Sequence, residues 1–368
     1  MTDVRNISAT VSPSAAAGGR TLARPPRQSN FELLRIVAMF LVLVLHADFL
    51  SLGVPEAKDF AAAPANAWTR TFFEMMAICA VNVFVMISGW FGIRATLRGG
   101  LRFLFQACFF YFGIYGVMLL TGGAEMTAKN LLECMKMDWF TISYLTLFII
   151  SPVLNAFARQ ATVRQFAGVL AAFFLLQTLY GCTELNDQFN RGYSAISFAG
   201  IYLLARFMSL HRRRFFRFGL LVYLACLLAK ALIFWALSGS EDYNRWALYY
   251  INPLVILQAA ALVAFVSTVK MPVIRIINRI AASAYAVYLL HINDFILVKY
   301  FKSNVVQLYN QYSGVECIGL ILMFLVVVFC AGILIDQVRI LLWNAVSVWL
   351  PALFRKSSRK PKPAPATD

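Results

Sequence analysis

The sequence predicts an all-α membrane protein, a polytopic bundle of about ten transmembrane helices with both termini in the cytoplasm. Hydrophobic residues make up 61% of the 368 positions and charged residues only 14%, whereas about a quarter of the residues in a soluble domain are charged. Apolar runs of roughly twenty residues, the length that spans a bilayer, recur along the chain. Connections rich in Lys and Arg alternate with poorer ones, which predicts that the rich connections and both termini are cytoplasmic.

The last apolar run is longer than one straight span requires, and Asp336 and Arg339 interrupt it. It therefore fits one helix followed by an interfacial segment. No internal repeat is visible, which weakens the case for a transporter built from repeats. In chain order, the runs are Phe31–Leu52, Trp68–Ile93, Phe103–Thr121, Trp139–Phe157, Phe166–Tyr180, Ala195–Leu210, Phe218–Leu237, Ala247–Val269, Ala281–Val298 and Val315–Trp349.

The two ends of the chain differ in composition from the rest. Residues 1–30 lack the apolar core of a secretory signal, so we expect a disordered cytoplasmic tail. Residues 31–350 form one membrane domain, and residues 351–368 form a second disordered, basic cytoplasmic tail. The net charge of +16 does not indicate nucleic acid, because the basic residues flank apolar runs. This is the pattern of loops that lie against the anionic lipids of the inner (cytoplasmic) membrane.

The seven cysteines lie mostly within apolar runs and lack the paired spacing of metal ligands. We therefore expect no metal site and treat the cysteines as small hydrophobic residues. Cys134 and Cys182 lie near connections that are expected to face outward, where a disulfide between them is a minor alternative.

Arg35 and His46 lie in the first apolar run, where an ionisable group is costly and marks a functional site by default. Eleven residues advance a helix by about three turns, so both side chains occupy one face, about 16 Å apart along the axis. Glu32 is spaced to pair with Arg35. The alternative for His46 is a structural histidine bonded to a carbonyl of a neighbouring helix.

The second apolar run carries Glu74, Asn82 and Ser88 and leads into three arginines at positions i, i+4 and i+8. If this segment is helical, the arginines form one stripe that suits phosphate oxygens. The alternative is that they only set the topology, because arginines just inside a span are expected anyway. The three residues are Arg94, Arg98 and Arg102.

A further histidine, His291, ends the segment Tyr288–His291 inside an apolar run, while His211 opens a basic run and is interpreted as solvated. A polar group on the outer side offers hydroxyl and amide groups to a sugar, although ordinary loop chemistry would explain it equally well. It consists of Asn186, Arg191, Tyr193 and Ser194.

Together these residues resemble the membrane-bound acyltransferase family 3, whose members O-acylate cell-envelope polysaccharides and other acceptors. The signature of its first helix, an arginine followed after ten residues by a histidine, is similar to Arg35 and His46. The resemblance covers about nine-tenths of the chain. Its other blocks are similar to Val81–Trp90, the basic residues Arg94 and Arg98, Trp139–Asn155 with Tyr144, Gly192–Ser194 and Tyr288–His291.

The resemblance implies an acyl-coenzyme A donor, usually acetyl-coenzyme A, that acts as a substrate and not as a permanently bound cofactor. It implies as acceptor a hydroxyl of an envelope glycan or its lipid-linked precursor, with polysaccharide-assembly proteins and membrane lipids as partners. Some members carry a further extracytoplasmic hydrolase domain after the membrane bundle, and this chain ends soon after its last apolar run. We therefore expect the bundle itself or a separate partner to complete the transfer.

From the resemblance and the residue chemistry we expect His46 to act as general base, with direct transfer and an acyl-histidine both open. Arg35 and Glu74 complete the expected catalytic set. The donor phosphates are assigned to Arg94, Arg98 and Arg102. The residues expected to bind substrate are Asn82, Ser88, Trp139, Tyr144, Tyr193 and His291.

Two other classes of function fit the same composition. In a secondary transporter of a small anionic or glycan-related substrate, intramembrane Arg, His and Glu side chains would line the substrate path. An inactive subunit of a polysaccharide-export complex would need neither Arg35 nor His46. A coenzyme A-dependent activity that requires His46 would separate the enzyme from both alternatives.

Overall fold

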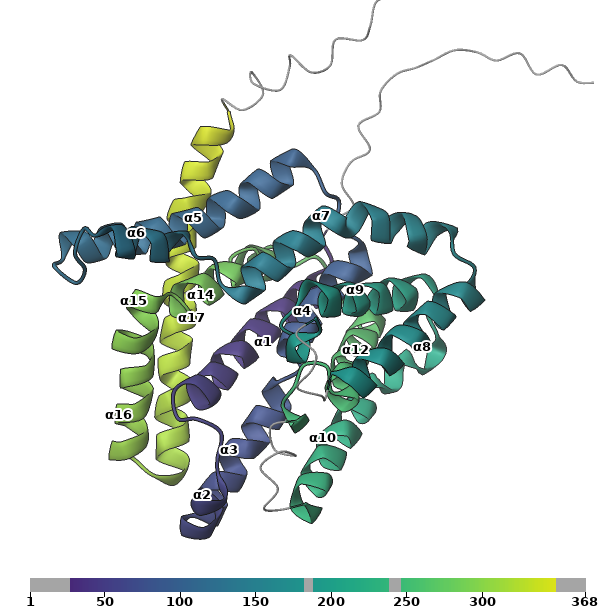
Figure 1. Cartoon of the computed structure of the whole chain (residues 1–368), viewed down its shortest axis with the longest axis horizontal. Coiled ribbons are helices and arrows are strands. Elements are labelled where there is room, and N and C mark those ends of the chain that lie inside the picture. Colours follow the sequence, from purple (N-terminus) through teal and green to yellow (C-terminus); the bar gives the residue numbers. More distant parts are fainter. Residues whose placement is uncertain (1–26, 182–187, 238–245, 349–368) are drawn as a thin grey trace, which may run out of the picture.

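The computed structural model describes residues 27–181, 188–237 and 246–348, and all regular secondary structure in these ranges is helical (Figure 1). They contain seven helices long and apolar enough to cross a membrane, or eight if one bent pair counts as a single span. Two further apolar helices, α9 (Ala195–Leu210) and α12 (Pro253–Thr268), are shorter. The protein is therefore an all-helical, multi-pass membrane protein, while the count of about ten spans and the location of the termini remain predictions.

The candidate spans run in chain order from one side of the bundle to the other. The bent pair consists of residues Arg275–His291 and Asp294–Gln311, which meet at an angle of 65°. The spans are α1 with η1 (Ser29–Leu45, His46–Leu50), α3 with α4 (Pro64–Ala77, Ala80–Phe91), α5 (Leu97–Leu120), α7 (Trp139–Gln160), α8 (Val163–Tyr180), η3 with α10 (Arg214–Phe218, Gly219–Ala236) and α17 (Gly314–Ser347).

Shorter helices connect or complete these spans. They are α2 (Ala57–Ala62), α6 (Ala128–Met135), η2 (Asn190–Gly192), α13 (Arg275–Ala281), α14 (Ala284–His291), α15 (Asp294–Ile296), η4 (Leu297–Lys302) and α16 (Ser303–Gln311).

Helix α1 lies in the middle of the bundle and packs against α3, α4, α12, α13, α14 and α17 (Figure 1). Its start is fixed by Asn30, whose side-chain amide donates to the carbonyls of Val266 and Val269 at 2.8 and 3.1 Å. Its last turn, His46–Leu50, is a π-helix. Such a turn accommodates one extra residue and changes which side chains face a neighbour, and it is frequent at functional sites.

The helix between residues 64 and 91 breaks after Ala77, and side chains of α10 satisfy the carbonyls that the break releases. Lys230, which is fully buried, donates from Nζ to the carbonyl of Met75 at 2.7 Å. The hydroxyl of Tyr223 donates to the carbonyl of Met76 at 2.9 Å. Inside a membrane, a freed carbonyl needs such a partner. The break is therefore held by a dedicated pair of donors.

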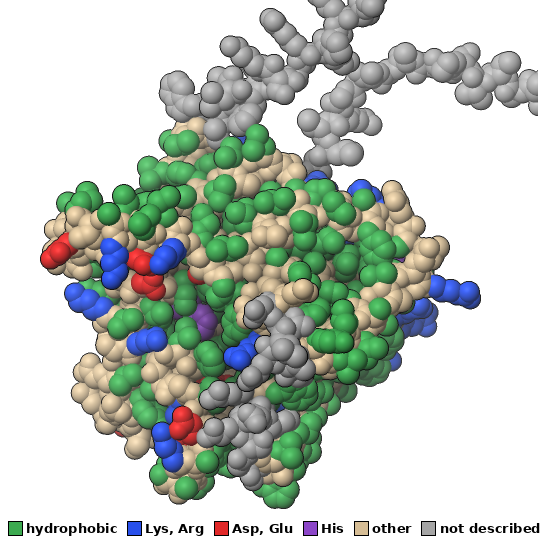
Figure 2. Space-filling view, in the orientation of Figure 1, with side chains coloured by type: hydrophobic (Ala, Val, Ile, Leu, Met, Phe, Trp, Pro, Cys, Tyr) green, Lys and Arg blue, Asp and Glu red, His purple; other side chains and the backbone are tan. Residues whose placement is uncertain are grey.

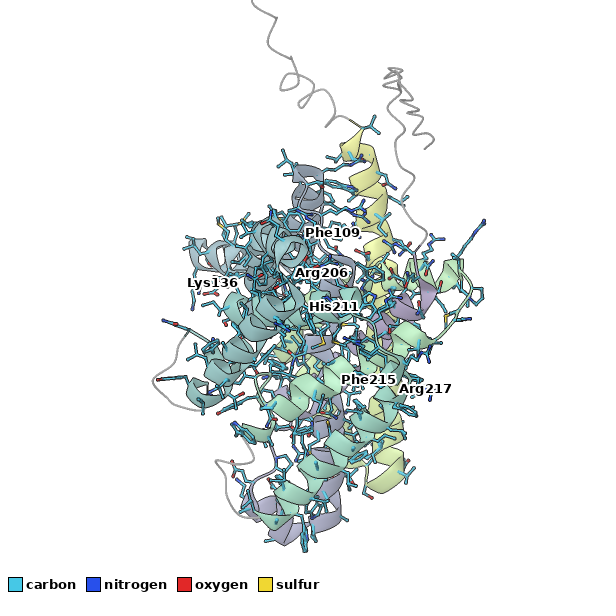
Figure 3. All side chains as sticks on the ribbon, turned by 90° about the vertical axis from the view of Figure 1, so that its right-hand side faces the viewer. Phe109, Lys136, Arg206, His211, Phe215 and Arg217 are labelled. Atoms are coloured by element: carbon cyan, nitrogen blue, oxygen red, sulfur yellow. The ribbon has the colours of Figure 1, made fainter. Side chains whose placement is uncertain are left out.

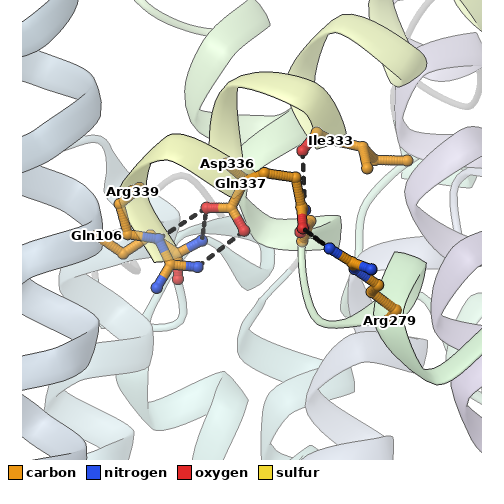
Figure 4. A network of polar contacts seen from close by, with 7 residues as sticks. Gln106, Arg279, Ile333, Asp336, Gln337 and Arg339 are labelled. Atoms are coloured by element: carbon orange, nitrogen blue, oxygen red, sulfur yellow. Dashed lines mark hydrogen bonds and ion pairs between the residues drawn. The ribbon is translucent and has the colours of Figure 1, made fainter. Parts of the chain in front are cut away.

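The expectation of an interruption in the last apolar run is wrong, because α17 is one continuous helix of 34 residues. Asp336 and Arg339 are both fully buried and form two hydrogen bonds of 2.8 Å. Gln106 of α5 adds a third bond to Asp336 at 3.2 Å (Figure 4). The two charges lie at i and i+3 and neutralise each other on one helix face, so the helix continues through them.

The outer surface is largely hydrophobic on the face seen in Figure 2, with the charged side chains in separate groups. This is the surface expected of a protein surrounded by lipid. Several basic side chains lie at the connection between α9 and α10, where Figure 3 labels Arg206, His211 and Arg217. Arg206 and Arg212 both contact Trp90 at the end of α4, so basic residues from separate connections gather at one end of the bundle.

Candidate active site

A cavity of about 290 Å³ joins the face of α1 that carries Arg35 and His46 to α4, α5, α7 and α14. We call it the donor cavity. It brings together six of the residues singled out in the sequence, although they come from four different helices. These residues are Arg35, His46, Ser88, Arg102, Trp139 and Tyr144.

His46 forms a hydrogen bond with the second membrane histidine. Its Nδ1 lies 2.7 Å from Nε2 of His291, and both rings are buried. Nδ1 of His291 lies 2.7 Å from the carbonyl oxygen of Val287. A carbonyl oxygen only accepts, so Nδ1 of His291 carries a proton, and in the neutral ring Nε2 accepts from Nδ1–H of His46. The remaining nitrogen of His46, Nε2, then carries a free lone pair.

This arrangement differs from the structural alternative for His46. The residue bonded to a carbonyl is His291, and the carbonyl belongs to its own helix. His46 instead lines the donor cavity, with its tautomer fixed from behind. A histidine held in this way has the arrangement of a general base with a second group that orients it.

Asp138, which the sequence analysis did not single out, orders the wall beside the two histidines. Its carboxylate accepts from the hydroxyls of Tyr288 at 2.7 Å, Tyr111 at 2.6 Å and Thr141 at 2.5 Å. The Tyr288 ring lies 6.3 Å from the ring of His46. Asp138 is also the N-cap of α7, and an aspartate directly before an apolar run was the available signal.

The mouth of the donor cavity is cationic. Arg27, Arg35 and Arg102 line it, and no Asp or Glu is among the lining residues. Glu32 lies behind them and pairs with Arg35 at 2.5 Å, as its spacing predicted, while Arg27 is 3.9 Å away. Three guanidinium groups against one carboxylate leave the mouth with excess positive charge, which favours a polyanionic ligand.

The single arginine stripe predicted for Arg94, Arg98 and Arg102 is not formed. Residues 92–96 are not helical, because Gly92 takes a φ of +76° at the end of α4 and Thr96 then caps α5. Arg94 and Arg98 are exposed and do not line the donor cavity. Only Arg102 of the three reaches it.

Glu74 lies on a different side of the bundle centre from the donor cavity. It is fully buried on α3 beside Asp48, whose carboxylate pairs with Arg70 at 2.6 Å. The position next to Nδ1 of His46, where an orienting carboxylate was expected, is occupied by His291. The structure therefore assigns Glu74 to the Asp48–Arg70 cluster, and a catalytic role for it stays a prediction.

The remaining predicted residues approach the donor cavity through Trp139. Tyr193 packs on Trp139 with ring centroids 4.5 Å apart, and Asn82 donates to the carbonyl of Tyr250, whose ring stacks on Trp139 at 5.9 Å. Asn186 and Cys182 lie outside the described residues, so the outer polar group and the disulfide stay predictions. His211 stacks on Phe207 and takes no part in the donor cavity.

Within the described ranges there is no group of three or more His, Cys, Asp or Glu side chains that could hold a metal ion. The model of a family described as an acyltransferase domain matches residues 28–335. That range contains both histidines, Asp138 and Arg102. No match was found among the curated proteins or the solved structures.

Proposed function

The chain belongs to acyltransferase family 3, and from that premise we propose that it is an acyl-coenzyme A-dependent O-acyltransferase of the bacterial inner membrane. The proposed donor is acetyl-coenzyme A. The proposed acceptor is a hydroxyl of a cell-surface polysaccharide or of its lipid-linked precursor. The observation that carries the proposal is the His46–His291 pair at a cavity whose mouth is formed by arginines.

The charge of the donor cavity supports coenzyme A as the donor. Coenzyme A carries several phosphate charges, and Arg27, Arg35 and Arg102 offer charge-assisted hydrogen bonds to them. Arg35 and His46 are separated by about 16 Å along α1. An uncharged, flexible pantetheine arm suits that distance, with the phosphates held at the arginines and the thioester near His46. This assignment replaces Arg94 and Arg98 by Arg27 and Arg35.

The geometry of the pair supports general-base catalysis. Nε2 of His46 takes the proton of the acceptor hydroxyl as its oxygen attacks the thioester carbonyl. The carbon–sulfur bond then breaks, and the leaving thiolate takes the proton from His46. His291 accepts the hydrogen bond from Nδ1–H throughout and stabilises the imidazolium, in the role of an orienting partner. Proton and acyl group are balanced without any further reactant.

The test is a transfer assay with purified full-length protein in nanodiscs. Wild type should consume acetyl-coenzyme A when a glycan acceptor is supplied, and His46→Gln should not, although it should bind coenzyme A normally. Transport remains the rival class. Flux of a substrate into liposomes that needs no coenzyme A and is unchanged in His46→Gln would overturn the enzymatic proposal in favour of transport.

A further inference from the structure

The residues that follow His46 face two other hollows at the opposite end of α1 from Arg27. The first is an apolar groove of about 600 Å³ between the end of α1, α3 and the start of α17. Its floor and walls include Val44, Ala47, Phe73, Ile321, Leu322 and Leu325. These side chains belong to membrane-crossing helices, so the groove lies at a depth where hydrocarbon is the natural occupant.

The second hollow is a polar chamber of about 620 Å³, formed by residues 51–59 and by α16. Its lining offers the side-chain oxygens and nitrogens of Ser51, Glu56, Asp59 and Asn310. Leu52, Arg70 and Tyr309 line both hollows. The apolar groove and the polar chamber are therefore two parts of one amphipathic site, with Arg70 at their junction.

The charges around the junction are already balanced. Arg70 pairs with Asp48 at 2.6 Å and also donates to the carbonyl of Gly53. Lys58 pairs with Glu56 at 2.8 Å. Asp59 brings a further carboxylate to the chamber. Among the described residues that line either hollow, carboxylates therefore outnumber cations, and each cation has a carboxylate partner.

This balance is the reverse of the one in the donor cavity, where three arginines and no carboxylate line the mouth. A phosphate placed at Arg70 would meet Asp48, Glu56 and Asp59 without a cation to neutralise it. Juxtaposed like charges of this kind exclude a ligand. A neutral head with several hydroxyls suits the chamber instead, because carboxylates and amides accept and donate hydrogen bonds to hydroxyls without a charge requirement.

We propose that the apolar groove and the polar chamber together bind the acceptor as a neutral amphiphile. The occupant has a hydrocarbon chain in the groove and an uncharged, hydroxyl-bearing head, such as a glycosyl group, in the chamber. An amphiphile whose head is joined to its chain through a phosphate is rejected. The proposal rests on the proposed function for the word acceptor only. Ala47 and Asp48 line the groove directly after His46, so the bound head lies on the far side of the catalytic turn from the donor.

The test uses two photoreactive probes with the same decyl chain, a decyl glucoside and a decyl phosphate, on the full chain in phosphatidylcholine nanodiscs. We expect the glucoside to label residues 63–73 and 312–325, as mapped by mass spectrometry. The phosphate should label them at least about tenfold less. Asp59→Asn keeps the oxygen that accepts from the Glu56 amide but removes a charge, and it should narrow that difference.

A groove-filling variant and its neighbour provide the matched control. Ile321→Trp should reduce glucoside labelling about tenfold, because the larger ring occupies the groove. Met323→Trp lies two residues further along α17, is 60% exposed and does not line the groove, so it should label as wild type. Equal labelling by both probes, or labelling unaffected by Ile321→Trp, would overturn the proposal. Binding of coenzyme A to the donor cavity is measured separately, so failure of the proposed function and failure of this inference give different results.

Discussion

Two buried polar pairs lie on either side of the donor cavity, and they differ in what surrounds them. The His46–His291 pair lies at a π-turn, and one ring nitrogen of His46 has no role within the pair. The Asp336–Arg339 pair lies in an unbroken helix, doubly bonded and closed off by Gln106, which itself lines the cavity. A polar pair that faces a cavity with an unused lone pair is available for chemistry, whereas an enclosed and mutually neutralised pair maintains the fold.

The largest expected effect breaks the first pair. His46→Gln keeps the volume and some hydrogen bonding of the side chain but cannot titrate near neutral pH. We expect it to lower the rate of acyl transfer by about 10²–10⁴-fold with an unchanged Kd for coenzyme A. The rate is measured at matched protein concentration in nanodiscs.

The control for this variant must be chosen with the structure in view. His291 bonds directly to His46, so it is a partner and not an independent comparison. His291→Gln can still accept from Nδ1–H through its amide oxygen, and we expect a smaller loss of rate. A wild-type rate in His46→Gln together with an inactive His291→Gln would exchange the two roles.

The second prediction breaks the enclosed pair. Asp336→Leu leaves the guanidinium of Arg339 buried without a counter-charge, which costs about 3–5 kcal/mol. The unfolding temperature in detergent should fall accordingly. The double variant with Arg339→Met should recover most of this loss, because no charge is then left buried. Equal melting temperatures for wild type and Asp336→Leu would show that the ion pair does not hold α17.

The third prediction separates the arginines of the cavity mouth from those outside it. A charge-assisted contact to phosphate contributes about 1.5–3 kcal/mol, so Arg102→Ala should weaken coenzyme A binding by about ten- to a hundredfold. Arg98→Ala, one helical turn earlier on α5 but outside the donor cavity, is the matched control. Isothermal titration of both variants distinguishes them. A larger loss for Arg98→Ala would restore the arrangement predicted from spacing alone.

The smallest expected effect concerns the wall of the first pair. Tyr288→Phe removes one hydrogen bond to Asp138 and leaves the ring beside His46. One such bond contributes about 1 kcal/mol, so the rate should fall by about three- to tenfold. If Tyr288 positions the histidines, the pH dependence of the rate should also shift. An unchanged pH profile with a lower melting temperature would assign Tyr288 to packing only.

The sequence was sufficient for features that depend on residues within one helix. The Arg35–Glu32 pair follows from i, i+3 spacing, and the placement of Arg35 and His46 on one cavity-facing side follows from the helical repeat. The continuous helix through Asp336 and Arg339 was predictable in the same way, because the two charges have the same spacing. The interruption predicted instead came from treating each charge alone.

Features that depend on tertiary structure were out of reach. His46 and His291 are 245 residues apart, and neither periodicity nor charge pattern indicates that their rings meet. The arginine stripe failed because Gly92 turns the chain between two helices. Asp138 offered only the general signal of an N-cap, and its contact with Tyr288 joins positions 150 residues apart. The family match supports the type of enzyme, while the donor and the acceptor rest on the chemistry of the two sites.

The buried lysine at the helix break also bears on how the chain is assembled in the membrane. A lysine at the centre of an isolated transmembrane helix costs about 2.5–3.5 kcal/mol on insertion scales. Met75, whose carbonyl receives Lys230, is synthesised about 150 residues earlier. When α10 enters the bilayer, its acceptor is therefore already there, and insertion of the later helix is coupled to the earlier one. Replacing Lys230 by leucine would ease the entry of α10 by itself and remove the partner that draws it to α3.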